Sequence, residues 1–259
     1  MPLERKEPAT TGSTDLRAEH TRLAIRRRLA KTQKRNYLRD AVFGAVDGTV
    51  TTFAVVSGVK GAQLPVEIAL ILGTTNLMAD GFSMAIGNYL AGRTDKDYQD
   101  SLFRTEEAHI QNIPEGEREE VRQIFRKKGF KGNILEKAVS IITSDKNRWI
   151  DTMLKEEYSA STAEFVPWKA ALVMYAAFIF VGFFPLLAFV LHRIIPQAAF
   201  DPFHISILTT TLAFFMVGAF KNKNLGLVWW RGGLQTLFIG GFAALLAYFT
   251  GVFLRNLIA

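Results

Sequence analysis

Apolar residues gather in five long runs along the chain, and polar segments separate the runs. Runs of about 18–25 apolar residues are long enough to cross a bilayer as a helix. The pattern therefore predicts an all-α membrane protein with five transmembrane helices. The runs cover about residues 41–59, 66–90, 168–191, 205–220 and 233–254.

Two features inside these runs predict how the helices are packed and shaped. Gly44 and Gly48 stand four residues apart in the first run, a spacing that lets another helix backbone approach closely. Pro185 lies within the third run and predicts a kink, which neighbouring helices can accommodate.

A few polar residues lie inside the first two runs. Asp47 is the charged residue of the first run, and an ionisable group at that depth is costly and indicates function. The structural alternative is a protonated Asp47 that hydrogen-bonds a neighbouring helix. In the second run Asn76, Asp80 and Met84 are spaced by four, so they form one stripe that faces a bundle interior or a pore. A lone Met usually packs, but the thioether of Met84 is also a soft ligand for a transition metal.

The second and third runs are separated by a polar segment, residues 94–166, which holds 15 of the chain's 24 acidic residues. Helical character continues from the second run as far as Asn112. A second helix is expected from Pro114, which suits a first helical turn, with Asn112 as its cap. A third helix is expected over residues 144–158. The segment thus predicts a three-helix domain that is too polar for a large core, and metal or a second subunit is expected to stabilise it.

This polar segment presents candidate metal ligands at helical spacing. Glu106 and His109 are three residues apart, as are Glu117 and Glu120, so each pair lies on one helix face. Two such pairs on neighbouring helices can gather a divalent cation at a membrane mouth. The alternative is a solvated acidic face with surface salt bridges to the basic residues Arg118, Arg122 and Lys155. The third helix adds Met153, Glu156 and Glu157.

Composition narrows the class of partner. The chain has 259 residues, is 49% hydrophobic, contains no Cys and carries a net charge of +7. Without thiolates, a metal site must use oxygen, nitrogen or thioether ligands. In a membrane protein a positive charge reflects the positive-inside rule and contact with anionic lipid, so no nucleic-acid partner is expected.

The distribution of Lys and Arg predicts the topology. The basic segment 1–38, the acidic domain 94–166 and the loop 221–224 fall on one side of five spans, and we assign that side to the cytoplasm. Residues 39–93 then hold the first two spans, and residues 167–259 hold the last three. Because one copy has few polar residues within the membrane, we expect a homodimer with the pathway on its two-fold axis.

Five stretches together carry a resemblance to a known family. They read AVFGAVDGTVTTFAVVSG, ADGFSMAIGNYL, IPEGEREEVRQIFRKKGF, TSDKNRWIDTMLKEE and GGLQTLFIGGFAALLAYFTG. From about residue 36 to its end, the chain resembles the vacuolar iron transporter (VIT) family. The resemblance implies a five-span homodimer that moves ferrous iron out of the cytosol in exchange for protons.

The resemblance also implies roles for single residues. An Asp of the first span and a Met of the second line the pathway, and here these are Asp47 and Met84. Metal gathers in the cytoplasmic domain on glutamates, and the matching positions are Glu106, Glu117, Glu120 and Glu157, with Met153 beside them.

Two positions depart from the family pattern. His109 stands where plant-type members carry a Glu, and Leu154 stands where a second Met is expected. An imidazole keeps a ligand but removes a negative charge, which favours Fe²⁺, Zn²⁺, Co²⁺ or Ni²⁺ over Ca²⁺ or Mg²⁺. It also makes binding more sensitive to pH near neutrality.

We therefore expect a transporter rather than an enzyme, with Fe²⁺ as its cargo and Zn²⁺, Mn²⁺ and Co²⁺ as other ions that the site can bind. Because Asp47 must lose its proton to bind a cation, metal and protons compete for one carboxylate. Asp80 is either a second proton site or a structural hydrogen-bond partner. The membrane is expected to be a bacterial plasma membrane or a vacuolar membrane, and the absence of a targeting segment favours the bacterial one.

Three alternatives follow from the same residues. A Mn²⁺ exporter would use the same architecture, because carboxylates suit Mn²⁺ well. A membrane-bound ferroxidase would use the Glu-x-x-His spacing of Glu106 and His109, but di-iron carboxylate bundles need two such motifs and the sequence contains one. A membrane scaffold would bind no metal.

Overall fold

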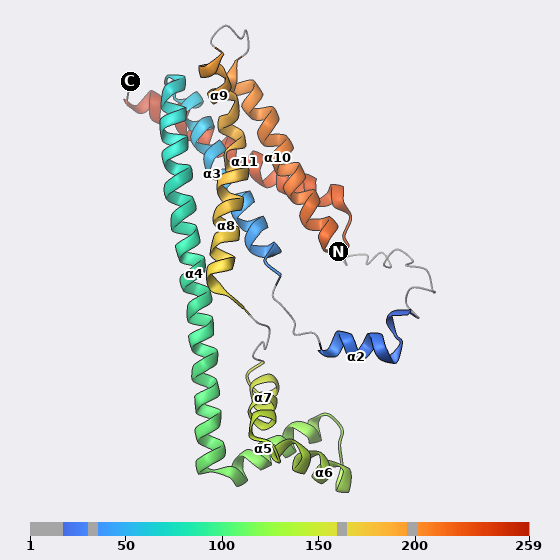
Figure 1. The fold of residues 1–259 in the computed structure, drawn as a ribbon. Coiled ribbons are helices and arrows are strands. Elements are labelled where there is room, and N and C mark those ends of the chain that lie inside the picture. The colour runs from blue at the N-terminus through green and yellow to red at the C-terminus, as the bar shows by residue number, and fades with distance from the viewer. Residues whose placement is uncertain (1–17, 31–35, 160–164, 196–200, 259) are drawn as a thin grey trace. The chain divides into compact units, whose positions relative to one another are not determined.

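The computed structural model describes residues 18–30, 36–159, 165–195 and 201–258. Within this part of the chain all regular secondary structure is helical (Figure 1). Much of the predicted basic segment, residues 1–17 and 31–35, lies outside the described residues. The helices are α2 (Arg22–Ala30), α3 (Leu38–Gly61), α4 (Val66–Asn112), α5 (Pro114–Lys127), α6 (Gly132–Thr143), α7 (Lys146–Glu156), α8 (Pro167–Gly182), α9 (Phe184–Ile194), α10 (Pro202–Asn224) and α11 (Trp229–Ile258).

The chain divides into two compact units, and α4 contributes residues to both. Of the described residues, 18–30, 36–90, 166–195 and 201–258 belong to one unit, and 91–159 and 165 belong to the other. The first unit, here called the membrane unit, contains the apolar helices. The second, here called the acidic unit, contains the end of α4 and the helices α5, α6 and α7.

The membrane unit confirms the predicted apolar spans. Four of its helices are long and apolar enough to cross a membrane, namely α3, α4, α10 and α11. A fifth span is formed if α8 and α9 count as one, because these two helices follow each other with a bend of 48°. Pro185 lies in the first turn of α9, so the kink predicted for the third span is present (Figure 1).

Hydroxyl groups of α10 stabilise the bend between α8 and α9. The Ser206 hydroxyl donates to the Pro185 carbonyl oxygen at 2.6 Å. The Thr209 hydroxyl donates to the Phe184 carbonyl oxygen at 3.1 Å. These two hydrogen bonds tie the first turn of α9 to α10.

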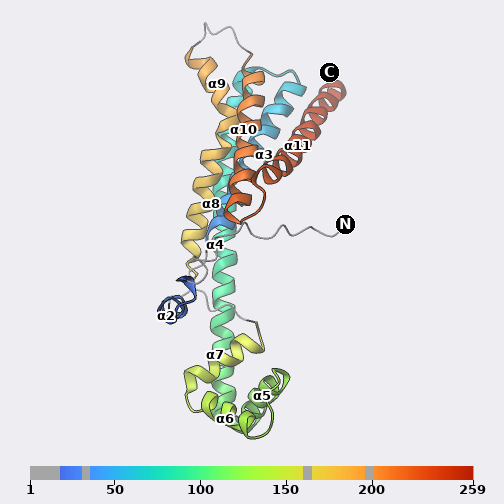
Figure 2. The ribbon, with the colours of Figure 1, turned by 90° about the vertical axis from the view of Figure 1, so that its right-hand side faces the viewer.

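Small residues set the packing of the membrane unit. Helix α3 packs against α8 and α11, and α10 packs against α11, α9 and α3 (Figure 2). A Cβ added at Gly48 would overlap the Phe178 carbonyl oxygen of α8, which confirms the close approach predicted from the Gly44 and Gly48 spacing. Gly218 of α10 and Gly232 of α11 meet in the same way. Large buried side chains such as Phe178 and Phe214 fill the space between these contacts.

The acidic unit has a core of its own, although a small one. The N-terminal cap of α7 is Asp145, whose carboxylate accepts a hydrogen bond from the Arg148 backbone N–H at 2.8 Å. Helix α7 is therefore shorter than the helix predicted over residues 144–158. Helix α6 was not predicted at all. Its buried residues join those of α4, α5 and α7 in one apolar cluster of Ile110, Val121, Leu135, Val139, Trp149, Ile150 and Met153.

The turn between α4 and α5 differs from the prediction in its cap. Pro114 begins α5 as expected, but the cap residue is Ile113, which makes no side-chain capping bond. The predicted cap was wrong, because the Asn112 side chain instead donates to the Ala108 carbonyl oxygen at 2.8 Å. Asn112 thus extends the end of α4, and the turn needs a single residue.

Candidate metal centre

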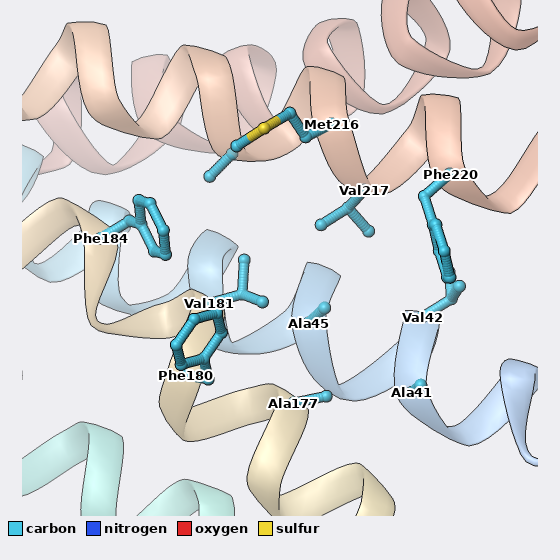
Figure 3. Close-up of a pocket in the computed structure, with 11 residues that line it drawn as sticks. Ala41, Val42, Ala45, Ala177, Phe180, Val181, Phe184, Met216, Val217 and Phe220 are labelled. Atoms are coloured by element: carbon cyan, nitrogen blue, oxygen red, sulfur yellow. The ribbon is translucent and has the colours of Figure 1, made fainter.

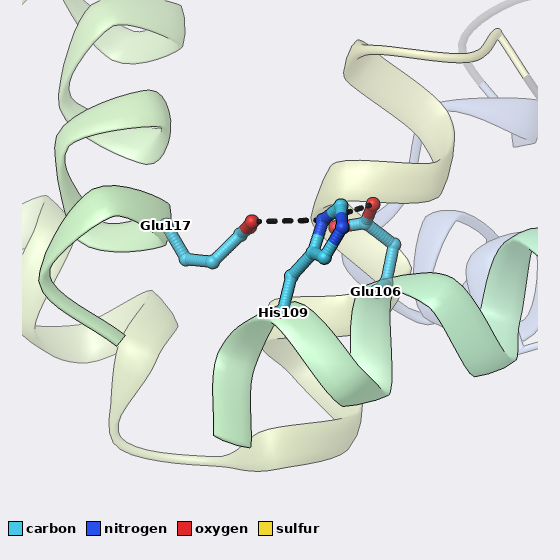
Figure 4. Close-up of side chains that lie close together, drawn as sticks. All are labelled: Glu106, His109 and Glu117. Carbon is cyan, nitrogen blue, oxygen red and sulfur yellow. Dashed lines mark ion pairs between the residues drawn. The ribbon is translucent and has the colours of Figure 1, made fainter. Parts of the chain in front are cut away.

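Helices α4 and α5 bring two buried carboxylates and an imidazole together. Glu106 and His109 lie one turn apart on α4, and Glu117 lies in the first turns of α5. The tight turn at Ile113 folds α5 back so that Glu117 faces the other two (Figure 4). Glu106 and Glu117 are 1% and 5% exposed, whereas the His109 side chain is 49% exposed. The group therefore has a buried acidic side and one face open to solvent.

The distances in this group suit a shared cation. The His109 Nδ1 atom lies 3.3 Å from Glu117 Oε1 and 3.9 Å from Glu106 Oε1. One ligand atom from each of the three residues lies within 4.8 Å of the other two. Oxygen and nitrogen ligands at such spacing can hold one divalent transition metal. The first ligand pair predicted from the sequence and one member of the second are thus brought together.

One oxygen atom of each buried carboxylate lacks a hydrogen-bond partner among the described residues. Glu106 Oε2 and Glu117 Oε2 are buried and form no hydrogen bond with any residue that the structure describes. Burial, followed by repulsion from Glu106 and Glu120, raises the pKa of Glu117 to about 7. Burial likewise raises the pKa of Glu106. Buried carboxyl groups that resist ionisation and have open oxygen atoms are well suited to a cation, which would supply the missing charge.

Tyr158 and two more acidic residues complete the surroundings. The Tyr158 hydroxyl donates to Glu106 Oε1 at 3.0 Å, which fixes one oxygen of that carboxylate. Burial, and then repulsion from Glu120, raises the pKa of Glu157. Glu120 and Glu157 therefore belong to the same electrostatic field as the buried pair. The sequence reasoning missed Tyr158, since a tyrosine next to an acidic residue carries no distinctive signal.

Met153 occupies a different environment from the other predicted ligands. Its side chain is fully buried in the apolar cluster of the acidic unit. The structure gives it packing contacts there, in keeping with the usual role of methionine in a core. A role for its sulfur in metal binding stays a prediction.

Other carboxylates of the acidic unit have ordinary salt bridges. Arg122 pairs with Glu136 at 2.9 Å and also with Glu119. Hydrogen bonds from Arg122 lower the pKa values of both carboxyl groups. These carboxylates, and others on the surface, therefore fit the alternative interpretation, in which acidic residues form a solvated face with salt bridges. The remaining surface pairs of this unit include Arg118–Glu115, Lys128–Glu156 and Lys146–Glu107.

The polar residues predicted for the pathway lie on α3 and α4. Asp47 is half-buried on α3, and Asp80 is half-buried on α4. Asn76 and Met84, which share the predicted stripe with Asp80, are also half-buried.

A second link between α3 and α4 was not predicted. The Asn88 side-chain amide donates to Asp40 Oδ1 at 3.1 Å, and Asp40 is buried. Asp40 precedes the first apolar run, so a search within the runs could not find it. The pair ties the beginning of α3 to α4.

Comparison with known proteins places the chain in a family. A model described as the VIT family matches residues 38–252. The chain belongs to the VIT family. The match begins at the first residue of α3 and ends within α11, so it covers both the membrane unit and the acidic unit.

Relatives in the VIT family are similar to this chain over most of their length. A vacuolar iron transporter of Toxoplasma gondii is 32% identical over 256 residues, which cover 92% of this chain and 83% of the relative. Vacuolar iron transporter 1 of Arabidopsis thaliana is 29% identical, over 82% of this chain and 83% of the relative. A vacuolar iron transporter of Plasmodium berghei is 27% identical, over 86% and 84%. These VIT-family relatives are named as transporters rather than as enzymes.

Proposed function

We propose that this protein exports ferrous iron from the cytosol in exchange for protons, and that its acidic unit collects the ion. The observation that carries the proposal is the buried group of Glu106, His109 and Glu117, whose carboxylates lack a Lys or Arg partner among the described residues. Family relatives named as iron transporters support iron as the cargo. The helices long and apolar enough to span a membrane support transport across one.

Collection of the ion follows from the electrostatics of the acidic unit. A cation that approaches the open face of His109 meets two carboxylates whose desolvation is not yet compensated. Binding replaces a proton on Glu117, because a carboxyl group must be ionised to act as a metal ligand. Glu120 and Glu157 add negative potential, which raises the local concentration of cations.

Transfer through the membrane unit requires ligands at the depth of the apolar core. Asp47 and Asp80 supply carboxyl oxygens, Asn76 an amide oxygen and Met84 a thioether. A cation and a proton compete for the same carboxylate at Asp47, and this competition is a direct physical route to antiport. Each ion that leaves frees a carboxylate for a proton that travels in the opposite direction.

The assembly that we propose is a homodimer with the acidic unit in the cytoplasm. Helix α4 carries its polar stripe beside several exposed apolar side chains, among them Ile71, Met78 and Phe82. A second copy would cover such a face and place two sets of polar residues around one pathway. The alternation of spans puts the beginning of α3, the acidic unit and the α10–α11 turn on the basic side, which the positive-inside rule assigns to the cytoplasm.

Whether the transported ion is Fe²⁺ or Mn²⁺ can be tested directly. Carboxylates accept Mn²⁺ well, while the imidazole of His109 favours metals later in the first transition row. Competition between Fe²⁺ and Mn²⁺ in one transport assay separates the two ions, and Fe²⁺ is expected to move faster.

The experiment that tests the proposal uses purified protein in liposomes with an acidic interior. Fe²⁺ entry and internal pH are followed together for the wild type, for Asp47→Ala and for the control Asp97→Ala, whose carboxylate pairs with Arg93 on the exposed surface of α4. Fe²⁺ entry should alkalinise the interior in the wild type and the control, but not in Asp47→Ala. Normal transport by a folded Asp47→Ala variant would refute the mechanism.

A further inference from the structure

The membrane unit contains an apolar cavity that none of the steps above uses. It has a volume of about 330 Å³, and side chains from α3, α8, α9 and α10 converge on it (Figure 3). Its walls are alanine, valine, phenylalanine and methionine, so no polar ligand suits it. Phe180 and Phe220 on its rim are 72% and 56% exposed, which means that the cavity opens sideways to the surroundings of the helices.

A second cavity adjoins the first at Val42, and two cationic side chains line it. It has a volume of about 560 Å³ and shares Val42 with the apolar cavity. Arg39 at the start of α3 and Lys221 near the end of α10 both line it. Lys221 directly follows Phe220, which lies beside Val42 in Figure 3. The two cavities adjoin at Val42, and together they are here called the groove, with an apolar body and a basic mouth.

The positive charge at the mouth is not neutralised within the described chain. Neither Arg39 nor Lys221 forms an ion pair with any carboxylate that the structure describes. The nearest acidic residue in sequence, Asp40, is buried and accepts a hydrogen bond from Asn88 of α4.

Aromatic side chains indicate the depth of this mouth in a bilayer. Trp229 and Trp230 begin α11, a few residues after Lys221, and both are about half exposed. Tryptophans gather at the level of the lipid headgroups. The basic mouth thus lies at headgroup level, and the apolar body extends from it toward the hydrocarbon.

We propose that this groove binds one anionic phospholipid, with an acyl chain in the apolar cavity and the phosphate between Arg39 and Lys221. The two parts of the groove match the two parts of the lipid in polarity, in charge and in order along the membrane normal. A zwitterionic lipid suits the mouth less well, because its own cation would face Arg39 and Lys221. The lipid bridges α10 and α3, and α3 is the helix that carries Asp47.

The test measures lipid binding by native mass spectrometry of the full-length protein in detergent. Phosphatidylglycerol and phosphatidylcholine are titrated separately into the wild type, Arg39→Gln with Lys221→Gln, and the control Lys223→Gln with Arg255→Gln. The control also removes two charges, but neither residue lines the groove. The wild type and control should prefer phosphatidylglycerol by about thirtyfold, the value expected for two cations near a membrane surface, and the first variant should lose this preference.

A third variant tests the apolar part of the groove. Val42→Trp fills the point that the two cavities share, and it should weaken the binding of both lipids. Equal binding of the two lipids by the wild type would overturn the proposal, as would an unchanged preference in the Arg39 and Lys221 variant or an equal loss in the control. A dimer that ignores phosphatidylglycerol and dissociates in Val42→Trp would assign the groove to a second copy instead. None of these readings depends on which ion the protein transports.

Discussion

Two carboxylates on the same helix, Glu117 and Glu119 of α5, have opposite surroundings. Glu117 is buried beside Glu106 and His109, and burial raises its pKa to about 7. Glu119 faces solvent and accepts hydrogen bonds from Arg122 and Gln123, which lower its pKa. The residues are two positions apart, so they point to opposite faces of the helix. One acidic face of α5 therefore forms surface salt bridges, whereas the other presents buried carboxyl groups that a ligand could bind.

The two faces of α5 differ in what compensates the desolvation of their carboxylates. On the exposed face a guanidinium group supplies the counter-charge, and an exposed pair of this kind contributes about 0–1 kcal/mol to stability. On the buried face no Lys or Arg among the described residues supplies the counter-charge, so burial still destabilises the ionised carboxyl groups of the apo protein. A bound divalent cation would turn this cost into binding affinity. The paired face should therefore respond weakly to mutation, and the buried face strongly.

The largest effect is expected for removal of the buried charge. Glu117→Gln keeps the size of the side chain but removes the carboxylate, and it should weaken Fe²⁺ binding by roughly 100-fold, or about 2.7 kcal/mol. The matched change Glu119→Gln on the same helix should alter affinity by less than about twofold. Calorimetric titration of the full-length protein checks both. Equal losses in the two variants would show that the acidic field, rather than the buried group, binds the ion.

A smaller effect is expected from pH. Because the pKa of Glu117 is raised from 4.5 to about 7, protons compete with metal at pH 6 and compete little at pH 8. Affinity should rise by about tenfold between these values, and Glu117→Gln should remove most of the rise. The sign for folding is opposite: the folded apo protein binds this proton more tightly, so its stability falls as pH rises from 4.5 to about 7. A melting temperature that rises in this window because of Glu117 would contradict the assignment.

Replacement of the imidazole should change selectivity more than affinity. His109→Glu gives a set of three carboxylates, which should improve Mn²⁺ binding relative to Zn²⁺ by several-fold, since imidazole favours the later metals. His109→Gln, which offers a neutral oxygen, is the control for loss of the imidazole alone. Competition titrations with the two metals measure the ratio. An unchanged ratio in both variants would remove His109 from the ligand set.

The smallest effect is expected on the paired face. Arg122→Ala breaks the contacts with Glu119 and Glu136 and should cost less than about 1 kcal/mol of stability, because the partners remain solvated. Thermal unfolding in the absence of metal measures this cost, and titration should show unchanged Fe²⁺ affinity. A large loss of affinity would mean that the two faces of α5 are coupled.

The membrane unit was the part most open to prediction from the sequence. Long apolar runs leave few alternatives to membrane-spanning helices, and Pro185 acts locally, so both the spans and the bend were found. A close approach of another helix at Gly48 was also expected from its spacing, and the structure shows that this helix is α8. The hydrogen bonds from the Ser206 and Thr209 hydroxyls to the first turn of α9 were not predicted, because donor and acceptor lie more than 20 residues apart in sequence.

The acidic unit was predicted less completely. Helical spacing correctly paired Glu106 with His109, but spacing alone could not show which of 15 acidic residues are buried. Which of them are buried depends on the turn at Ile113 and on helix α6, which was not predicted. Burial and the missing counter-charge are properties of the folded unit, and they separate Glu117 from Glu119.

The most direct measurement of the central claim is the initial rate of Fe²⁺ transport against Fe²⁺ concentration in liposomes, for the wild type, Glu117→Gln and Glu119→Gln. If the buried group collects the ion for the membrane unit, Glu117→Gln should raise the KM at least tenfold and leave the maximal rate nearly unchanged, while Glu119→Gln matches the wild type. An unchanged KM in a folded Glu117→Gln variant that still transports iron would show that the buried group does not supply the pathway.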